Sequence, residues 1–398
     1  MKVLLLNQFF HPDLSATAQM LTDLAEDLAA SGLTVTALAT RGSYLGGGAL
    51  PARDEHRGVA IRRLWATSLG KRTLVHRALD YASFYASAAL ALATMPRQDV
   101  VLALTTPPLI AAAGMVARAL RGSRLVYWVQ DLYPEVAVAF GVMRPRSPGA
   151  RLMAAVSRAV LSRADAVVAL GEAMRERCVA AGARPDHTAV IPNWADGASV
   201  RPIPHHENPL RAELAQGARC LVMYSGNIGR GHDVATLVEA ARRLRHRADI
   251  AFLFQGEGAR RAAAERVAAE LPNLRLGPYQ PRERLAASLS AGDLHLVSLD
   301  PPLGGLLEPS QLYGLMAAGR PALFVGPAES EVARTVEREG CGAAFRNGDA
   351  EGLAAAVAAL ADDPGRREEM GRRAREALLA RYDRRVATAR FRDLVSSL

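Results

Sequence analysis

Residues 303–321 read LGGLLEPSQLYGLMAAGRP, and this stretch carries most of the information about the fold. Glycines and a proline open a loop, Ser310 stands where a helix N-cap is expected, and an apolar run continues until Gly319 and Pro321 end it. The apolar residues 294–299 before the loop predict a strand. A strand, a small-residue loop and a capped helix make an anion site, because free N–H groups and the helix dipole meet there. Many α/β proteins use such a turn for packing alone, so both interpretations stay open.

The size and composition of the chain predict two α/β domains. At 398 residues it is too long for one ordinary core, and half of its residues are hydrophobic. Its apolar start is too short for a signal peptide, and no apolar run reaches the roughly 20 residues of a membrane span. Three widely spaced cysteines predict reduced thiols, without disulfides or metal-ligand spacing. We therefore expect a cytoplasmic protein, either soluble or peripheral to a membrane.

The formal net charge of +9 comes almost wholly from arginine, because Lys2 and Lys71 are the two lysines. A basic protein can bind nucleic acid, anionic lipid or phosphorylated small molecules. The sequence has no nucleic-acid motif, and its aromatic residues are sparse for base stacking. Phosphates on a small substrate or on a lipid are the expected partners, and nucleic acid is not.

Short apolar strands alternate with helices in both halves of the chain, which is typical of doubly wound parallel sheets. A proline-rich linker with Pro192, Pro202 and Pro204 separates the two series. We expect two doubly wound α/β domains over residues 1–200 and 201–382, followed by a tail helix. Two such domains with a cleft between the carboxyl ends of their strands form a ligand-binding arrangement.

Loops at strand ends in the second domain carry candidate phosphate-binding residues. One strand leads into GNIGRGH at residues 226–232, and the next leads into QGEG at residues 255–258. Glycines allow close backbone approach to a phosphate, and the guanidinium of Arg230 offers a forked charge. The alternative is a structural turn with a surface arginine. We favour the phosphate, since three small-residue loops are expected to face one cleft.

Strand-end loops in the first domain carry candidate reactive groups. Residues 130–135, QDLYPE, place Asp131 at the end of a strand, where open α/β sheets hold reactive side chains. A carboxylate there could accept a proton from an attacking hydroxyl, or it could cap the helix that starts near Pro134. Residues 7–17, NQFFHPDLSAT, form another such loop, in which His11 is more often a packed turn residue than a base.

Together the motifs resemble family 4 glycosyltransferases of the GT-B fold, and among them bacterial enzymes of exopolysaccharide and lipopolysaccharide assembly. In family order and over nearly the whole chain, they are NQFFHPDLSATAQ, TTPP, WVQDLYPE, IPNW, YSGNIGRGHD, QGEG and EPSQLYGLMAAGRP. The resemblance implies two Rossmann-like domains, an acceptor-binding N-terminal one and a nucleotide-sugar-binding C-terminal one. It also implies a metal-independent reaction that retains the anomeric configuration. The tail, residues 383–398, would be a helix that crosses back to the first domain.

This interpretation assigns a role to each candidate residue. The donor-binding residues are Gly226, Asn227, Gly229, His232, Gly256, Glu257, Glu308, Ser310, Gln311 and Leu312, and the acceptor-side residues are His11, Ser15 and Thr17. Arg230 would neutralise the leaving diphosphate, and Asp131 would orient the acceptor hydroxyl or take its proton. The chain has no Asp-x-Asp pair, and we expect neither a metal nor another cofactor. Where family members typically carry two glutamates, it has Leu306 and Gly314.

The predicted function is transfer of a hexose or N-acetylhexosamine from a nucleotide diphosphate sugar to a growing cell-surface glycan. The acceptor would be linked to polyprenyl diphosphate at the inner membrane face. Two alternatives stay open: a sugar-nucleotide 2-epimerase, which shares the architecture, and a non-catalytic relative that binds the donor without turnover. Residues 62–77, RRLWATSLGKRTLVHR, could lie on anionic lipid or form a solvated basic face.

Overall fold

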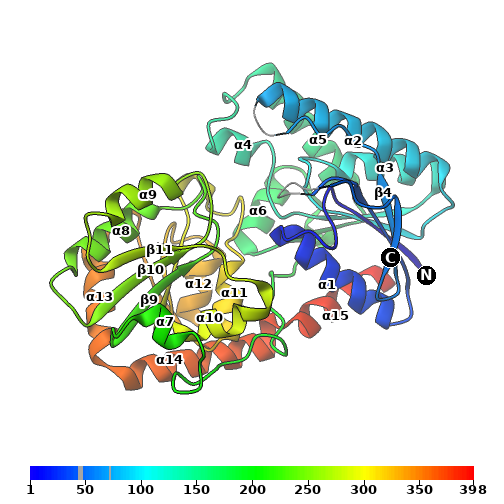
Figure 1. Ribbon diagram of the computed structural model, residues 1–398. Coiled ribbons are helices and arrows are strands. Elements are labelled where there is room, and N and C mark those ends of the chain that lie inside the picture. Colours follow the sequence, from blue (N-terminus) through cyan, green and yellow to red (C-terminus); the bar gives the residue numbers. More distant parts are fainter. Residues whose placement is uncertain (44–47, 71–72) are drawn as a thin grey trace. The chain divides into compact units, whose positions relative to one another are not determined.

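The computed structural model describes residues 1–43, 48–70 and 73–398, and the contacts of the chain divide it into two α/β units. Unit 1 consists of Met1–Pro192 and Ala387–Leu398, and unit 2 of Asn193–Val386. In Figure 1 each unit has a sheet covered by helices. The expected boundary after residue 200 lies at residue 192 instead. The intervening segment packs with unit 2, where Ala195 bridges Asp383 and Arg375 donates a hydrogen bond of 2.8 Å to the Val200 carbonyl.

Within the described part of unit 1, the strands form one sheet in the order β3-β4-β2-β1-β5-β6-β7-β8. They are β1 (Lys2–Leu6), β2 (Thr34–Thr40), β3 (Arg53–His56), β4 (Val59–Leu64), β5 (Val100–Ala103), β6 (Arg124–Trp128), β7 (Ala166–Ala169) and β8 (Thr188–Val190). The pairs are parallel apart from β3 with β4, which is antiparallel. Because β1 pairs with both β2 and β5, the strand order reverses at β1, and open α/β sheets bind ligands at such a point.

The helices of unit 1 cover both faces of this sheet. They are α1 (Ala16–Ala30), α2 (Leu74–Thr94), α3 (Ala111–Arg121), α4 (Glu135–Ala139), α5 (Pro148–Arg163), α6 (Glu172–Ala180) and most of α15 (Arg384–Ser396). Helices α2, α3 and α5 are neighbours, and α3 packs on β5 and β6 (Figure 1). The chain returns to unit 1 through α15, whose Phe391 ring lies 4.6 Å from that of Trp128. Thr388 on α15 also donates a hydrogen bond of 2.8 Å to Asp27.

The described strands of unit 2 form a parallel sheet in the order β11-β10-β9-β12-β13-β14. They are β9 (Cys220–Ser225), β10 (Ile250–Gln255), β11 (Leu274–Gly277), β12 (Leu294–Ser298), β13 (Ala322–Val325) and β14 (Gly342–Phe345). The strand order reverses at β9, which pairs with β10 and β12. The loops that follow these three strands therefore surround the reversal point.

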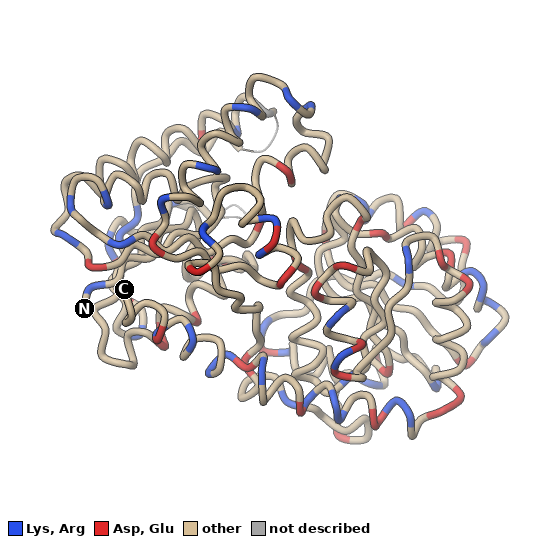
Figure 2. The backbone as a smooth tube through the Cα atoms, turned by 180° about the vertical axis from the view of Figure 1, so that it is seen from behind, with Lys and Arg blue, Asp and Glu red and all other residues tan. Residues whose placement is uncertain are grey.

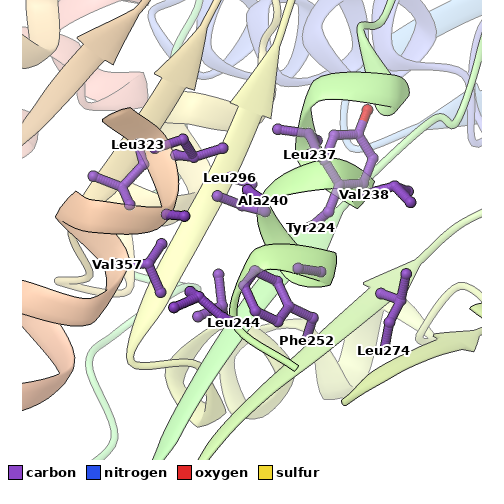
Figure 3. Packing of buried hydrophobic residues seen from close by; sticks show 14 of the residues in the cluster. Tyr224, Leu237, Val238, Ala240, Leu244, Phe252, Leu274, Leu296, Leu323 and Val357 are labelled. Carbon is purple, nitrogen blue, oxygen red and sulfur yellow. The ribbon is translucent and has the colours of Figure 1, made fainter. Parts of the chain in front are cut away.

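Helices pack on both faces of the second sheet and exclude water from its core. They are α7 (Arg211–Ala215), α8 (Val234–Arg243), α9 (Arg261–Ala268), α10 (Leu285–Ala291), α11 (Gln311–Ala317), α12 (Glu331–Arg338), α13 (Ala350–Asp362) and α14 (Pro364–Ala377). Figure 3 shows Leu237 of α8, Val357 of α13 and Phe252 of β10 in one cluster of buried hydrophobic side chains. Burying each such side chain contributes about 1.5–3 kcal/mol. Asp349 caps α13 as expected, because its carboxylate accepts the Gly352 N–H at 2.9 Å.

The net charge is divided unequally between the units. Unit 1 contains 23 Lys and Arg against 15 Asp and Glu, whereas unit 2 contains 26 against 25. Unit 1 thus has a formal charge of +8 out of the total of +9. Figure 2 shows basic and acidic residues interspersed along the chain. None of the helices in the described part of the chain has the length and hydropathy that crossing a membrane requires.

Candidate functional site

Two glycine loops at the carboxyl ends of β9 and β10 pack directly on each other. Gly226 and Gly256 have φ angles of 155° and 149°, which favour glycine. A β-carbon on Gly226 would lie 1.9 Å from Gln311 Nε2, so the side chain of Gln311 closes over this turn. The Ile228 N–H donates to the Glu257 carbonyl at 2.8 Å and joins the loops further along. The structure therefore brings the predicted donor residues Gly226, Gly256 and Gln311 into contact.

His232, at the end of the first glycine loop, is held in one orientation. Its Nδ1 lies 2.7 Å from the carbonyl oxygen of Ser298, the last residue of β12. A carbonyl oxygen only accepts hydrogen bonds, so Nδ1 carries the proton and Nε2 of the neutral ring is an acceptor. Burial lowers the pKa of His232 below its usual value. The ring is therefore neutral at pH 7 and cannot supply a positive charge to a diphosphate.

An ion pair that the sequence motifs did not single out joins the loops after β10 and β12. Arg260 Nη2 lies 2.7 Å from Asp300 Oδ2, and Arg260 also donates to the His232 carbonyl. The Asp300 N–H donates to the Gly231 carbonyl at 2.9 Å. This pair fixes the loop that bears His232, and its charges largely cancel. Arg260 follows the end of β10 and Asp300 follows the end of β12. Their position after apolar strands was the sequence signal that could have identified them.

Arg230 is the exposed cation of the glycine loop. No hydrogen bond or ion pair involves its side chain among the residues that the structure describes. Its neighbour Gly229 is buried, whereas the Asn227 side chain is exposed and the Asn227 carbonyl accepts the Tyr224 hydroxyl at 2.8 Å. Glu257 on the adjacent loop is exposed and pairs with Arg261 at 3.1 Å. The guanidinium of Arg230 is thus able to bind an anionic ligand.

Ser310 stands at the N-cap position of α11, as the sequence predicted, but its side chain does not cap the helix. Ser310 has helical φ and ψ angles of −67° and −13°, and its side chain makes no capping hydrogen bond. The chain enters α11 already in a helical turn, and this helix has only 7 residues. Leu312 is fully buried, so its side chain packs in the core, away from solvent. Gln311 differs, because its Nε2 donates to the Tyr224 hydroxyl at 3.3 Å.

Glu308 is a buried acid in the same stretch. Its Oε1 accepts the Glu331 N–H at the start of α12 at 3.2 Å. Oε2 has no hydrogen-bond partner in the described part of the chain. Burial raises the pKa of Glu308 to about 8, so the carboxyl group is largely protonated at pH 7. Glu308 faces protein in this conformation, and a ligand would reach its carboxyl only after a local movement.

Asp131 follows β6 in unit 1 and is half-buried. Burial raises its pKa to about 6. A carboxyl group with that pKa is mostly ionised at pH 7 and can still take up a proton, which suits a base or a hydroxyl-orienting group. Nearby, the loops after β1 and β5 are joined where the Gln8 N–H donates to the Thr106 carbonyl at 2.6 Å. Asp131 follows β6, which β5 separates from the reversal point at β1.

His11, Ser15 and Thr17 lie in the loop after β1 and the start of α1. The His11 ring stacks on the His56 ring at 3.6 Å, and Arg63 donates to the His11 carbonyl at 2.7 Å. Burial, and then the nearby His56, lower the pKa of His11. Thr17 is half-buried, and the Ser15 N–H donates a hydrogen bond of 2.8 Å to the Asp13 carboxylate. His56 and Arg63 belong to β3 and β4, so His11 contacts the side of the sheet away from β6.

Comparisons with known proteins agree with this architecture. Residues 15–194 match the family of glycosyl transferase 4-like domains. The chain is 29% identical over 248 residues to WbjE of Pseudomonas aeruginosa, named as a probable glycosyltransferase, a match that spans 62% of each chain. It is 27% identical over 352 residues to WcaI of Escherichia coli K12, the proposed colanic acid biosynthesis glycosyl transferase, covering 85% of this chain and 86% of WcaI. The crystal structure of HepE from Anabaena in complex with UDP and glucose superimposes with a TM-score of 0.74 at 16% identity and covers both chains fully.

The two parallel-sheet units define a protein of the GT-B fold class, as the sequence motifs predicted. Within that class, residues 15–194 match the glycosyl transferase 4-like domain family, and the similarity of the chain to WbjE and WcaI supports a glycosyltransferase.

Proposed function

We propose that the protein transfers a hexose or N-acetylhexosamine from a nucleotide diphosphate sugar to a cell-surface glycan, with retention of the anomeric configuration. The observation that carries this proposal is the packing of the loops after β9 and β10, which leaves the Arg230 guanidinium exposed beside them without an anionic partner among the described residues. The similarity to HepE, whose structure contains UDP and glucose, supports a nucleotide-sugar donor. The similarity to WcaI supports a surface-glycan acceptor.

In this reaction the bond between the sugar C1 and the diphosphate oxygen breaks, and the acceptor oxygen bonds to C1. Arg230 and nearby backbone N–H groups would hold the charge that develops on the diphosphate, a role worth several kcal/mol in such sites. These residues would do so without a metal. The neutral His232 would accept a hydrogen bond from a hydroxyl of the donor through Nε2. The proton of the acceptor hydroxyl would go to the departing phosphate or to Asp131, which also orients that hydroxyl.

The donor proposal is tested with the full-length protein and a panel of UDP-, GDP- and TDP-sugars in the presence of EDTA. We expect one donor to raise the melting temperature and to release its nucleoside diphosphate slowly. Release that occurs only when a divalent metal is restored would contradict the metal-independent mechanism. Tight donor binding without release or transfer would favour the non-catalytic alternative. Conversion of the free nucleotide sugar to its epimer would favour the epimerase.

We also propose that unit 1 contacts the inner membrane face, where a polyprenyl-linked acceptor would lie. Trp65 and Val75 are 65% and 66% exposed, and Leu69 and Leu79 are exposed beside them. Arg62 and Arg77 are exposed in the same segment, whereas Arg63 is buried and pairs with Asp54 at 2.9 Å. Lys71 and Arg72 lie outside the described residues. Apolar side chains next to arginines on a unit of charge +8 fit an anionic lipid surface.

Co-sedimentation with phosphatidylglycerol vesicles tests the membrane proposal. Replacing Trp65 and Val75 by serine is expected to weaken binding at least several-fold, because the apolar contact is lost. Leu152→Ser is the matched control, since Leu152 is equally exposed (67%) on α5. Unchanged binding by the double variant would refute a membrane contact through residues 62–77.

A further inference from the structure

Unit 1 contains a basic hollow at the amino edge of its sheet. Its volume is about 590 Å³, and the residues that matter in its lining are Arg97, Met115, Arg118, Ser123, Arg124 and Arg163. Strand β6 begins at Arg124 and ends three residues before Asp131. Five residues of strand span roughly 16 Å, so the hollow and Asp131 lie at opposite ends of β6. The hollow is therefore separate from the site at the carboxyl edge.

The Asp165 carboxylate pairs with two of the four arginines of the hollow, Arg118 and Arg124. Asp165 is buried, and it accepts hydrogen bonds from Arg118, from Arg124 at 3.1 Å and from the Leu125 N–H at 2.9 Å. Arg97 and Arg163 are exposed, and no ion pair involves either of them in the part of the chain that the structure describes. The group of four arginines and Asp165 thus has a surplus of positive charge.

Helix dipoles offset part of the excess positive charge of the four arginines and Asp165, but they do not neutralise it. Helices α2, α3 and α5 end close to the hollow in sequence, and cations are favoured at helix carboxyl ends. Each helix end is equivalent to about half of a negative charge, which solvent screens. Three such ends offset about one and a half charges at most, so they do not neutralise the group.

Ser123 supplies an independent indication of a ligand. Its residue is 2% exposed, it lines the hollow, and its Oγ has no hydrogen-bond partner among residues 1–43, 48–70 and 73–398. An unpartnered buried hydroxyl costs about 1–3 kcal/mol. The Ser123 Oγ is shielded from solvent, so a ligand oxygen would remove this cost after a small local movement that turns the hydroxyl into the hollow. The Ser123 N–H is already used by the Ala117 carbonyl at 3.4 Å, which leaves the hydroxyl as the unused donor.

We propose that this arginine hollow binds a phosphate-bearing anion at a site distinct from the donor site of unit 2. Planar guanidinium groups bind phosphate oxygens in pairs, and several of them match a phosphate group better than a single carboxylate. The volume lies in the range of small-molecule sites. The phosphate comes either from a soluble molecule, such as a pyrophosphate, or from the headgroup of a phospholipid. A ligand in this hollow would contact arginines that contribute to the excess positive charge of unit 1.

The Met115 methyl group provides a local readout of binding to this hollow. The full-length protein, labelled with ¹³C at its methionine methyl groups, would be titrated with inorganic pyrophosphate, and the Met115 signal assigned with Met115→Leu. We expect a saturable shift of this signal. R97E combined with R163E should abolish the shift, and Ser123→Ala should weaken the affinity by about tenfold or less, as expected for one hydrogen bond. The milder pair R97Q and R163Q repeats the test if charge reversal impairs folding.

Arg144→Glu with Arg151→Glu is the matched control, because both arginines are exposed in unit 1, lie outside the hollow and give the same change in charge. Sedimentation with phosphatidylglycerol or phosphatidylcholine vesicles identifies the source of the phosphate. Loss of vesicle binding in R97E/R163E alone, without a pyrophosphate shift in the wild type, would indicate a lipid headgroup. Absence of both effects, or equal effects in the control, would overturn the proposal. Donor turnover should be preserved in R97E/R163E, so this test is independent of the proposed transferase activity.

Discussion

The carbonyl oxygen of Gly226 lies against the α-carbon of Gly256, so closely that a β-carbon there would be 1.8 Å away. Each glycine follows one member of the pair Ser225 and Gln255, which end the neighbouring parallel strands β9 and β10. The register of the strands therefore brings the two loops together, and glycine allows them to touch. The surface proposed to receive the diphosphate depends on this contact.

Gly256→Ala is expected to destabilise unit 2. The added β-carbon overlaps the Gly226 carbonyl, and a φ of 149° is strained for alanine, so the cost is on the order of 3 kcal/mol. Urea unfolding followed by circular dichroism would measure it. Gly217→Ala is the control, because Gly217 also has a positive φ (87°) but has nothing within 4 Å of an added β-carbon. An equal loss in both variants would show that overlap with Gly226 is unimportant.

Glu308→Gln is expected to stabilise the protein increasingly as the pH rises. The folded-state pKa of Glu308 is about 8 and the unfolded value is 4.5, so the folded state binds more protons between these values. Its contribution to stability therefore falls as the pH rises from 4.5 to 8, and glutamine removes this fall. We expect the variant to gain roughly 2–4 kcal/mol relative to wild type between pH 5 and pH 8. Thermal unfolding across this range measures the gain, and the exposed Glu337→Gln should show none.

Asp131→Asn is expected to change the pH dependence of sugar transfer. If the Asp131 carboxylate accepts a proton or a hydrogen bond from the acceptor, kcat/KM of the wild type falls as the pH drops through about 6. The variant should lose this acidic limb, and its rate should drop about 10²-fold or more. Glu135→Gln, at an exposed carboxylate on α4, is the control and should behave as wild type. An acidic limb that survives in Asp131→Asn would assign the ionisation to another group.

Arg230→Ala is expected to impair the chemical step without affecting the fold. Removing one charge-stabilising donor from such a site lowers kcat by about 10²–10³-fold. Arg230 is exposed, so the midpoint of unfolding should stay within error of wild type. Arg245→Ala, another exposed arginine of unit 2, provides the comparison, and Arg230→Lys should recover part of the rate. Wild-type kcat in Arg230→Ala would exclude a role for this side chain at the leaving group.

The elements that could be predicted from the sequence are those whose residues repeat a pattern of burial. The strand predicted at residues 294–299 matches β12, and the strands predicted before the two glycine loops match β9 and β10, because apolar runs of this kind are buried in parallel sheets. Strand β3 was missed, since its residues, RDEH, are charged and mostly exposed and pair only with β4 at the sheet edge. Strand β14 was missed as well, because GAAF is short and half-buried.

The candidate site shows the same division. The glycine loops and Asp131 could be located from the sequence, since both follow apolar strands. The contact of His11 with His56 and the pairing of Arg260 with Asp300 could not, because each joins residues that are 40 or more positions apart. Ser310 stands at the N-cap position that the sequence predicted, but its φ and ψ angles are helical and its side chain makes no capping hydrogen bond.

The sequence by itself determined the two parallel-sheet units and the places where loops follow strands, because periodic burial and glycine spacing are local properties of the chain. Only the tertiary structure decided which charged side chains form ion pairs within the protein. It pairs Arg260 with Asp300 and Arg118 with Asp165, and it leaves Arg230, Arg97 and Arg163 without such partners among the described residues. Whether a charge is available to a ligand depends on contacts between distant segments, and strand order and loop packing set those contacts.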